Sequence, residues 1–197
     1  MDNDSKTEYR NHDFAGDTMD QRAFINYTAS WLKEGRRVVK QEGVCAAFID
    51  WRQLPAMTDC FQMSGWIWRG IAVWNKPSSR PQKGRFRAQA EYIVWGSKGA
   101  LPLDRNSPVL PGVFTTSSVP SKSRIHQTQK PLDLMRQVVK LCEKGERIFD
   151  PFAGSGTTIL AAELEGFDSL GIELDDYYAA EADKRIKEYL STVQQTV

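Results

Sequence analysis

A nine-residue turn near the C-terminal end of the sequence carries its strongest chemical signal. It lies between a short apolar run and a segment with helical spacing, and it reads Asp150-Pro151-Phe152-Ala153-Gly154-Ser155-Gly156-Thr157-Thr158. Open α/β sheets bind ligands beyond the carboxyl ends of their strands, and small residues there let a ligand approach the backbone. The turn lacks the lysine of a Walker A loop and the third glycine of a dinucleotide fingerprint. It therefore matches neither of these phosphate-binding motifs.

Two carboxylates frame this turn. Asp150 ends the strand before it, and Glu173 ends the next expected strand 23 residues later, near the spacing of about 20 residues at which an acid reaches ribose hydroxyls. Acids on both sides disfavour a phosphate-rich ligand and suit an adenosine with a cationic amino-acid tail, as in S-adenosylmethionine. The alternative is structural: the glycines serve tight strand-to-helix packing, and Glu173 caps the following helix.

The net charge of +1 conceals a strong asymmetry along the chain. Residues 76–131 hold ten basic residues and two acids, a net charge of +8, so the remainder carries −7. Such a segment suits the phosphate backbone of a nucleic acid, although a solvated loop that serves solubility is the other interpretation. The residues that we expect to contact DNA are Arg80, Lys83, Arg85, Arg87, Lys122 and Arg124.

Hydrophobic periodicity and helix breakers predict the elements that must position these residues. An apolar stripe and a capping Asp20 indicate a helix over 21–38. The other expected helices follow Asp50, run from Pro131 to Gly145, end near Glu165, and span 176–190; the expected strands are 44–49, 66–74, 90–95, 147–149 and 169–172. The second and third of these strands could pair as an antiparallel hairpin. The alternation of strand and helix after residue 146 is typical of a parallel α/β sheet.

Composition along the chain predicts its organisation. Residues 1–20 are polar and indicate a flexible arm. We expect residues 21–197 to form a single domain with three parts. These parts are a catalytic-side half at 21–98, a proline-rich and serine-rich loop at 99–127, and a cofactor-binding half at 128–197.

Three segments together resemble a known family. The turn, Gly171-Ile172-Glu173 after it and His126-Gln127-Thr128-Gln129-Lys130-Pro131 before it are similar to the amino-group DNA methyltransferases of bacteria and their phages. These enzymes methylate the exocyclic amine of adenine or cytosine. The chain looks most like the permuted type, in which the cofactor half follows the catalytic half. Upstream, the segments at 50–55, 65–70 and 80–96 resemble a phage-like branch.

The resemblance implies a fold, a cofactor, a partner and site residues. The fold would be the Rossmann-like α/β sheet of S-adenosylmethionine-dependent methyltransferases, and the partner double-stranded DNA. Lys130 and Pro131 would line the methionine end of S-adenosylmethionine. Asp150 and the rest of the turn through Thr158 would hold its amino-acid and sugar region, and Glu173 would bind the ribose.

One hallmark of the family is missing. Its members carry a D-P-P-Y-type tetrapeptide on a central strand, where a polar side chain and a proline carbonyl accept hydrogen bonds from the target amine, but this sequence has no Pro-Pro pair. The catalytic residues are therefore unknown, and Asp50 lacks the adjacent prolines and aromatic residue. Loss of that strand would leave unpaired backbone in the sheet. We expect a chain that is shortened at its start, completed by another polypeptide, or functionally decayed. A homodimer is an alternative partner arrangement.

Other reactive residues bound the chemistry. Cys45, Cys60 and Cys142 are too widely spaced for a disulfide framework or a metal site, and none follows a proline, which disfavours methylation at carbon 5 of cytosine. Five tryptophans lie within 51–95; we expect most in the core and one at a ligand. We expect His126 to hold the loop before its helix.

The sequence therefore predicts an S-adenosylmethionine-dependent DNA methyltransferase that acts on an exocyclic amine, of the restriction-modification type, with adenine preferred over cytosine. A non-catalytic module that binds cofactor or DNA is the second hypothesis. A small-molecule methyltransferase is the third, and the +8 segment argues against it. No apolar run reaches the ~18 residues of a membrane span, and the polar start lacks the pattern of a secretory signal. We expect a cytoplasmic protein without a membrane partner.

Overall fold

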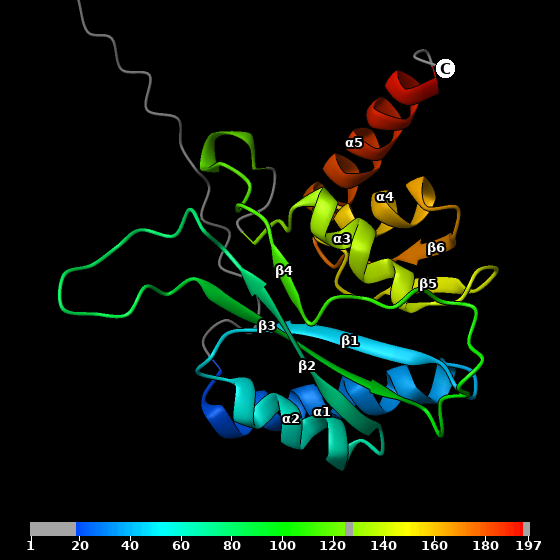
Figure 1. Ribbon diagram of the computed structural model, residues 1–197. Coiled ribbons are helices and arrows are strands. Elements are labelled where there is room, and N and C mark those ends of the chain that lie inside the picture. The colour runs from blue at the N-terminus through cyan, green and yellow to red at the C-terminus, as the bar shows by residue number, and fades with distance from the viewer. Residues whose placement is uncertain (1–18, 125–127, 195–197) are drawn as a thin grey trace, which may run out of the picture.

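The computed structural model describes residues 19–124 and 128–194. Nearly all of the predicted arm at 1–20, and His126, lie outside these described residues. The α-helices and strands, labelled in Figure 1, are α1 (Gln21–Val38), β1 (Val44–Ile49), α2 (Leu54–Met63), β2 (Ile67–Asn75), β3 (Ala90–Ser97), β4 (Val113–Thr115), α3 (Leu132–Val138), β5 (Arg147–Asp150), α4 (Thr157–Leu164), β6 (Asp168–Gly171) and α5 (Asp176–Gln194). Two short 3-10 helices are η1 (Ser121–Ser123) and η2 (Val139–Leu141). None of the described helices is long and apolar enough to cross a membrane.

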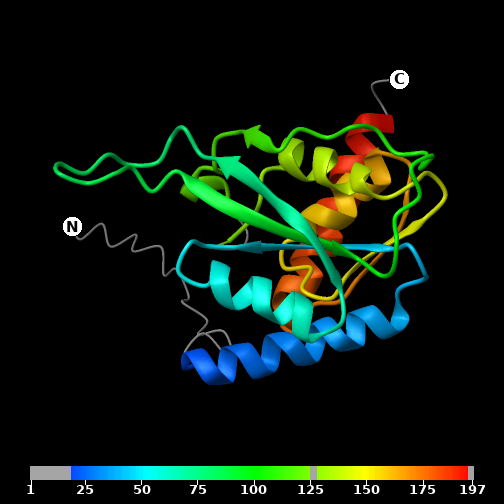
Figure 2. The same cartoon turned by 60° about the horizontal axis from the view of Figure 1, so that its bottom comes forward.

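A four-stranded sheet in the order β1-β3-β2-β4 forms one part of the molecule. β3 pairs antiparallel with both β1 and β2, which confirms the predicted hairpin of β2 and β3. β4 pairs parallel with β2, with Val113 opposite Val73. The loop between β2 and β3 projects away from the body of the molecule (Figures 1 and 2).

Helices cover both faces of this sheet (Figure 1), because side chains alternate along a strand. On one face, Val94 of β3 packs in a core with Leu32 of α1 and Phe61 of α2. On the other face, the neighbouring Ile93 packs with Leu134 of α3. α1 has its apolar stripe for a different reason, since an α-helix repeats every 3.6 residues. Asp20 caps the start of α1 by accepting a hydrogen bond from the backbone amide of Ala23 at 2.9 Å.

The second part of the molecule is the parallel pair β5 and β6, connected through α4. Ile148 of β5 and Ala161 of α4 share a core with Met135 of α3, and Phe48 of β1 packs against it. Within the described residues, no strand joins β5 to β1, so the strands form two sheets. α3 therefore links the parts, since its side chains enter both cores.

The structure differs from the predicted elements at three places. The loop at 99–127 contains β4 and η1, because pairing with β2 orders a segment that has no strand pattern of its own. The helix after Pro131 is α-helical only to Val138, and a single 3-10 turn follows, where the Cys142 amide bonds the Val139 carbonyl at 3.1 Å. α5 continues beyond residue 190 to Gln194.

An ion-pair cluster fastens α4 to α3 and η2. Glu165 accepts one hydrogen bond, from Arg136 Nε at 2.6 Å, and lies 2.8 Å from the Lys140 ammonium. Burial alone would raise the pKa of Glu165, but the hydrogen bonds and charges of Lys140 and Arg136 lower it overall. A carboxylate with a lowered folded pKa stabilises the fold above its usual pKa, and this contribution disappears as pH falls through the folded value.

We therefore expect Glu165→Gln to lower the melting temperature at pH 7, and the difference from the unmodified chain to shrink as pH falls below about 4.3. Differential scanning fluorimetry between pH 7 and pH 3 measures this. Glu188→Gln, at an exposed site on α5, serves as the matched control. A Glu165 difference that stayed constant over this range would contradict the assignment.

Candidate active site

The predicted turn joins the end of β5 to the start of α4. Gly154 and Gly156 have φ values of 52° and 71°, in the left-handed region that favours glycine. Two backbone hydrogen bonds tie the turn to the segment after β6: the Ile172 amide donates to the Asp150 carbonyl, and the Ala153 amide donates to the Ile172 carbonyl, both at 2.9 Å. The turn and this segment therefore lie side by side at the carboxyl ends of β5 and β6.

Glu173 lies against the turn, as its spacing predicts. Its Oε2 accepts a hydrogen bond from the Gly154 amide at 2.8 Å, and its Oε1 accepts one from the Asp175 amide at 3.1 Å. The start of α5 is capped by Asp175 instead, whose Oδ1 accepts from the amides of Tyr177 and Tyr178. The alternative in which Glu173 caps this helix is therefore wrong. Each Glu173 oxygen keeps a second lone pair for a ligand hydroxyl.

Polar side chains of the turn divide into two groups. The hydroxyls of the buried Ser155 and Thr157 lie 3.2 Å apart. Arg185 of α5 donates to the Ser155 carbonyl at 2.7 Å and to the Thr157 hydroxyl at 3.0 Å, so these hydroxyls brace the turn. Asp150 holds the Phe152 amide through Oδ1 at 3.0 Å. Its Oδ2 forms no hydrogen bond with any described residue, so this oxygen can accept one from a ligand.

The other predicted cofactor-binding positions surround the turn. Phe152 is half exposed, and its ring meets the Trp31 ring of α1 edge-on at 5.3 Å. Pro151 and Thr158 are half-buried, and Pro131 is buried directly before α3. Trp31 lies outside the tryptophan-rich stretch 51–95, so its nearness to the turn could be found only from the structure.

A second concave feature is an open cleft of about 700 Å³. One of its walls holds a carboxylate between two ammonium groups: Glu91 lies 3.0 Å from Lys130 and 3.3 Å from Lys76. Each lysine also lies over an aromatic ring, Lys130 over Phe48 at 5.1 Å and Lys76 over Trp74 at 5.3 Å. The remaining residues that line the cleft are Ile49, Asp50, Gln53, Ser118, Arg124, Thr128 and Gln129.

Lys130 therefore reaches Glu91, and no hydrogen bond or ion pair connects it to the turn within the described residues. Its predicted contact with the methionine end of a cofactor stays a prediction. Sequence reasoning missed the role of Glu91. A signal was available, since Glu91 and Asp104 are the two acids within the basic segment 76–131.

Asp50 has a structural task. Its carboxylate accepts hydrogen bonds from the Arg52 guanidinium at 2.9 and 2.5 Å and from the amides of Arg52 and Gln53 at 2.9 and 3.2 Å. Burial alone would raise the pKa of Asp50, but these hydrogen bonds lower it overall. The Gln53 Oε1 atom is buried without a hydrogen-bond partner among the described residues. A buried polar atom without a partner at the wall of a cleft is where a ligand donor can bind.

The loop between β2 and β3 holds most of the predicted DNA-contacting residues. Arg80, Lys83, Arg85 and Arg87 are all exposed there, and the loop contains no acid. Phe86 lies among them with its side chain wholly exposed, at 102%. Lys122 and Arg124 lie in and after η1, on a different loop.

Comparison with known proteins identifies the family. The model of the N6 and N4 methyltransferases, described as DNA methylase, matches residues 4–184. The chain belongs to this DNA methylase family. Among curated relatives of this methylase, YubD of Escherichia coli (strain K12) is 27% identical over 174 residues, which cover 85% of this chain and 74% of YubD. The type II methyltransferase M.HinfI of Haemophilus influenzae is 28% identical over 190 residues, or 84% of this chain and 53% of M.HinfI. The chain thus spans between about half and three quarters of the length of these relatives.

Solved structures confirm the predicted Rossmann-like methyltransferase fold. The M1.HpyAVI complex with S-adenosylmethionine is 25% identical, with a TM-score of 0.70 that covers 82% of this methylase and 83% of that chain. The cytosine-N4-specific PvuII DNA methyltransferase has a TM-score of 0.71 at 19% identity, covering 87% and 77% of the two chains, and this likeness concerns the fold.

Thiol chemistry does not fit the cysteines of this chain. Burial raises the pKa of Cys45 to about 12 and that of Cys142 to about 11, and it raises the pKa of Cys60 as well. Methylation at carbon 5 requires a thiolate nucleophile, and these thiols stay protonated at neutral pH. The described residues contain no group of three side chains suited to a metal ion.

Proposed function

We propose that this chain binds S-adenosylmethionine and methylates an exocyclic amine of double-stranded DNA, with adenine preferred over cytosine. The observation that carries the proposal is the Glu173 carboxylate, which lies 2.8 Å from the Gly154 amide at the carboxyl ends of β5 and β6. Membership in the DNA methylase family supports the reaction class. The M1.HpyAVI complex, which contains S-adenosylmethionine, supports the cofactor.

The residues around the turn fit this cofactor. Glu173 keeps acceptor capacity for the two ribose hydroxyls, and Asp150 Oδ2 can accept from the ammonium of the amino-acid tail. Two carboxylates repel the phosphates of a nucleotide but attract a ligand that carries ammonium and sulfonium charges. When bound, S-adenosylmethionine supplies an electrophilic methyl group on its sulfonium.

The cleft around Glu91 suits the target base. Its volume of about 700 Å³ lies within the range of small-molecule sites. Enzymes that act on duplex bases must extrude them from the stack, and aromatic side chains can receive the extruded base. Phe48 and the buried Trp74 line the cleft, with Lys130 and Lys76 over their rings. The buried Gln53 Oε1 can accept a hydrogen bond from an exocyclic amine or a ring N–H.

The basic loop between β2 and β3 suits the DNA backbone. Arg80, Lys83, Arg85 and Arg87 can neutralise phosphates without competition from a local acid. The wholly exposed Phe86 adds a ring that can stack on a base or enter between base pairs.

A second candidate function is a module that binds cofactor or DNA without transferring a methyl group, or a subunit that another chain completes. Two observations favour it: the 197 residues contain no Pro-Pro pair, and no described strand joins β5 to β1. The amine acceptor that the family places in D-P-P-Y is thus not supplied by this sequence.

Transfer of tritium from methyl-labelled S-adenosylmethionine to mixed-sequence duplex DNA separates the two. We expect the label in N6-methyladenine after hydrolysis and chromatography. Label in N4-methylcytosine would refute the adenine preference, and label in 5-methylcytosine would refute amine methylation. No transfer by a folded chain that binds the cofactor in calorimetry would favour the second function.

A further inference from the structure

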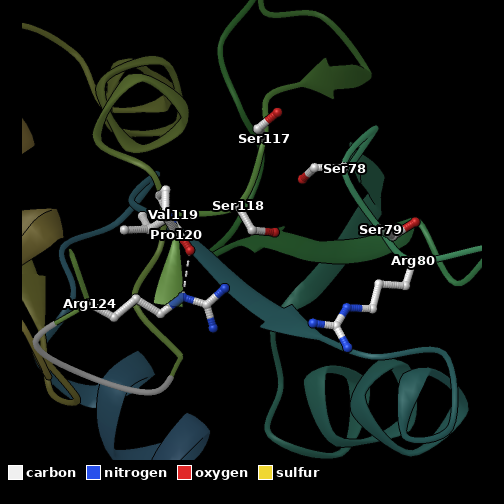
Figure 3. A pocket seen from close by; sticks show the side chains of 8 residues that line it. All are labelled: Ser78, Ser79, Arg80, Ser117, Ser118, Val119, Pro120 and Arg124. Carbon is white, nitrogen blue, oxygen red and sulfur yellow. Dashed lines mark hydrogen bonds between the residues drawn. The ribbon is translucent and has the colours of Figure 1, made fainter. Parts of the chain in front are cut away.

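A groove of about 490 Å³ adjoins the cleft around Glu91 (Figure 3). Two loops that are distant in sequence form it, the β2–β3 loop and the segment after β4. Its polar lining consists of Ser78, Ser79, Arg80, Ser117, Ser118 and Arg124. Ser118 and Arg124 also line the cleft, so the groove and the cleft share part of their walls.

The two arginines face each other in this groove. In Figure 3, the guanidinium groups of Arg80 and Arg124 approach from opposite loops, with the hydroxyls of Ser78 and Ser118 directed between the loops. Arg124 donates from Nε to the Val119 carbonyl at 2.6 Å, which orients its guanidinium plane. Arg80 is exposed and forms neither a hydrogen bond nor an ion pair with any described residue.

The chemistry of the groove differs from that of the cleft. No carboxylate lines the groove, whereas Asp50 and Glu91 line the cleft. Two guanidinium groups with hydroxyl donors match a tetrahedral oxyanion that has several acceptor oxygens, because guanidinium binds phosphate with paired N–H groups. The Ser79 Oγ atom is buried without a partner among the described residues, so a ligand oxygen there would satisfy it.

We propose that the groove binds the DNA backbone phosphate next to the nucleotide whose base enters the cleft, an inference that rests on the proposed function. A nucleotide places its base and its phosphate on opposite sides of one sugar. A base among Phe48, Trp74 and Gln53 therefore brings its phosphate toward the shared residues Ser118 and Arg124. Arg80 reaches the same phosphate from the opposite loop. The two arginines thus bind the phosphate from both sides, and this contact holds the extruded nucleotide in place.

The test removes the charge of one phosphate in the DNA and, separately, the charge of one arginine in the protein. A fluorescein-labelled duplex with one bulged adenine is prepared with an uncharged methylphosphonate linkage on the 5′ side of the bulge, on the 3′ side, or six nucleotides away. Fluorescence anisotropy gives the affinity of the full chain for each duplex at fixed salt. For the unmodified chain, we expect one linkage beside the bulge to weaken binding about tenfold more than the remote linkage does.

Arg80→Gln should abolish that difference, because the partner of the phosphate is gone. Arg85→Gln makes the same charge change on the same loop outside the groove, and it should preserve the difference while lowering overall affinity. Arg80 is exposed and forms no hydrogen bond or ion pair with any described residue, so the substitution should leave the melting temperature unchanged. An Arg80→Gln chain that kept the full difference would overturn the proposal.

A free phosphate is the other source of the same chemistry. Calorimetry with inorganic phosphate tests it directly: binding that needs Arg80, together with equal affinities for the adjacent and remote linkages, would assign the groove to a free anion and overturn the backbone assignment. The experiment also separates this inference from the proposed function. Affinity is measured without methyl transfer, so a negative result here leaves transfer standing, and an absence of transfer leaves the groove assignment standing.

Discussion

We expect the replacement of Glu173 with alanine to lower the affinity of the chain for S-adenosylmethionine by about 10- to 100-fold. A hydrogen bond to a carboxylate contributes about 1.5–3 kcal/mol, and 1.4 kcal/mol is a factor of ten in affinity. The substitution removes the proposed acceptor for the ribose and also leaves the Gly154 amide without its 2.8 Å partner. Isothermal titration calorimetry measures the loss, and unchanged affinity would refute the ribose assignment.

The loss of affinity has two sources, the missing acceptor for the ribose and a loosened turn. Two ligands that differ in their hydroxyls separate these sources. 5′-Methylthioadenosine and its 2′,3′-dideoxy analogue differ only in the ribose hydroxyls. The unmodified chain should discriminate between them, whereas Glu173→Ala should bind both equally if the carboxylate holds the hydroxyls. An effect that came only through a loosened turn would weaken both compounds and leave the discrimination intact.

Glu163→Ala is the matched control for this series. Glu163 is also a glutamate of the cofactor-binding half and also bonds a neighbour, accepting from the Ser169 hydroxyl at 3.1 Å. Its removal should leave the affinity for S-adenosylmethionine within a factor of two.

Gly156→Ala should lower the free energy of unfolding by about 2–4 kcal/mol, the second large effect. Gly156 has φ 71°, where an L side chain is strained, and a Cβ there would lie 2.9 Å from Ile186 Cδ1 and 3.1 Å from Ala182 Cβ. Both contacts belong to α5, which packs behind the turn. The substitution therefore strains the turn and pushes α5 away from it. Urea unfolding followed by circular dichroism gives the change.

Alanine substitutions at two other glycines separate the backbone strain at Gly156 from the steric contact with α5. Gly166 also has a positive φ, 77°, but a Cβ there meets nothing within 4 Å, so Gly166→Ala reports backbone strain alone. Gly35 lies inside α1, where a Cβ also meets nothing, so Gly35→Ala should stabilise the chain by about 0.5–1 kcal/mol. If Gly156→Ala and Gly166→Ala cost the same, the contact with α5 would carry no energy.

Elements with a strong local pattern were predictable to within a residue or two. The helix over 21–38 and the strand over 44–49 match α1 and β1, because periodicity and the Asp20 cap are properties of neighbouring residues. Where the local pattern was weak, the boundaries failed. β4 exists because β2 supplies its hydrogen-bond partners, and the pairing of Val73 with Val113 spans forty residues of sequence.

The candidate site was also predictable only in part from the sequence. The spacing of Asp150 and Glu173 predicted that both acids flank one turn, since consecutive parallel strands bring their carboxyl ends to one edge of the sheet. It did not predict which group each acid would bond. The Glu173 bond to the Gly154 amide and the α5 cap by Asp175 depend on the angle at which β6 meets α5, which the whole core decides.

The sequence by itself determined the family, the acid-framed turn and the concentration of positive charge in residues 76–131, because motif residues and charges are read directly from the order of amino acids. Only the tertiary structure decided that Lys76 and Lys130 form ion pairs with Glu91. It also decided that Arg80 and Arg124, from separate loops, line one groove that contains no acid. Net charge counts residues whether or not they are paired. Pairing depends on contacts between segments far apart in the chain, which packing of the sheet against α3 brings together.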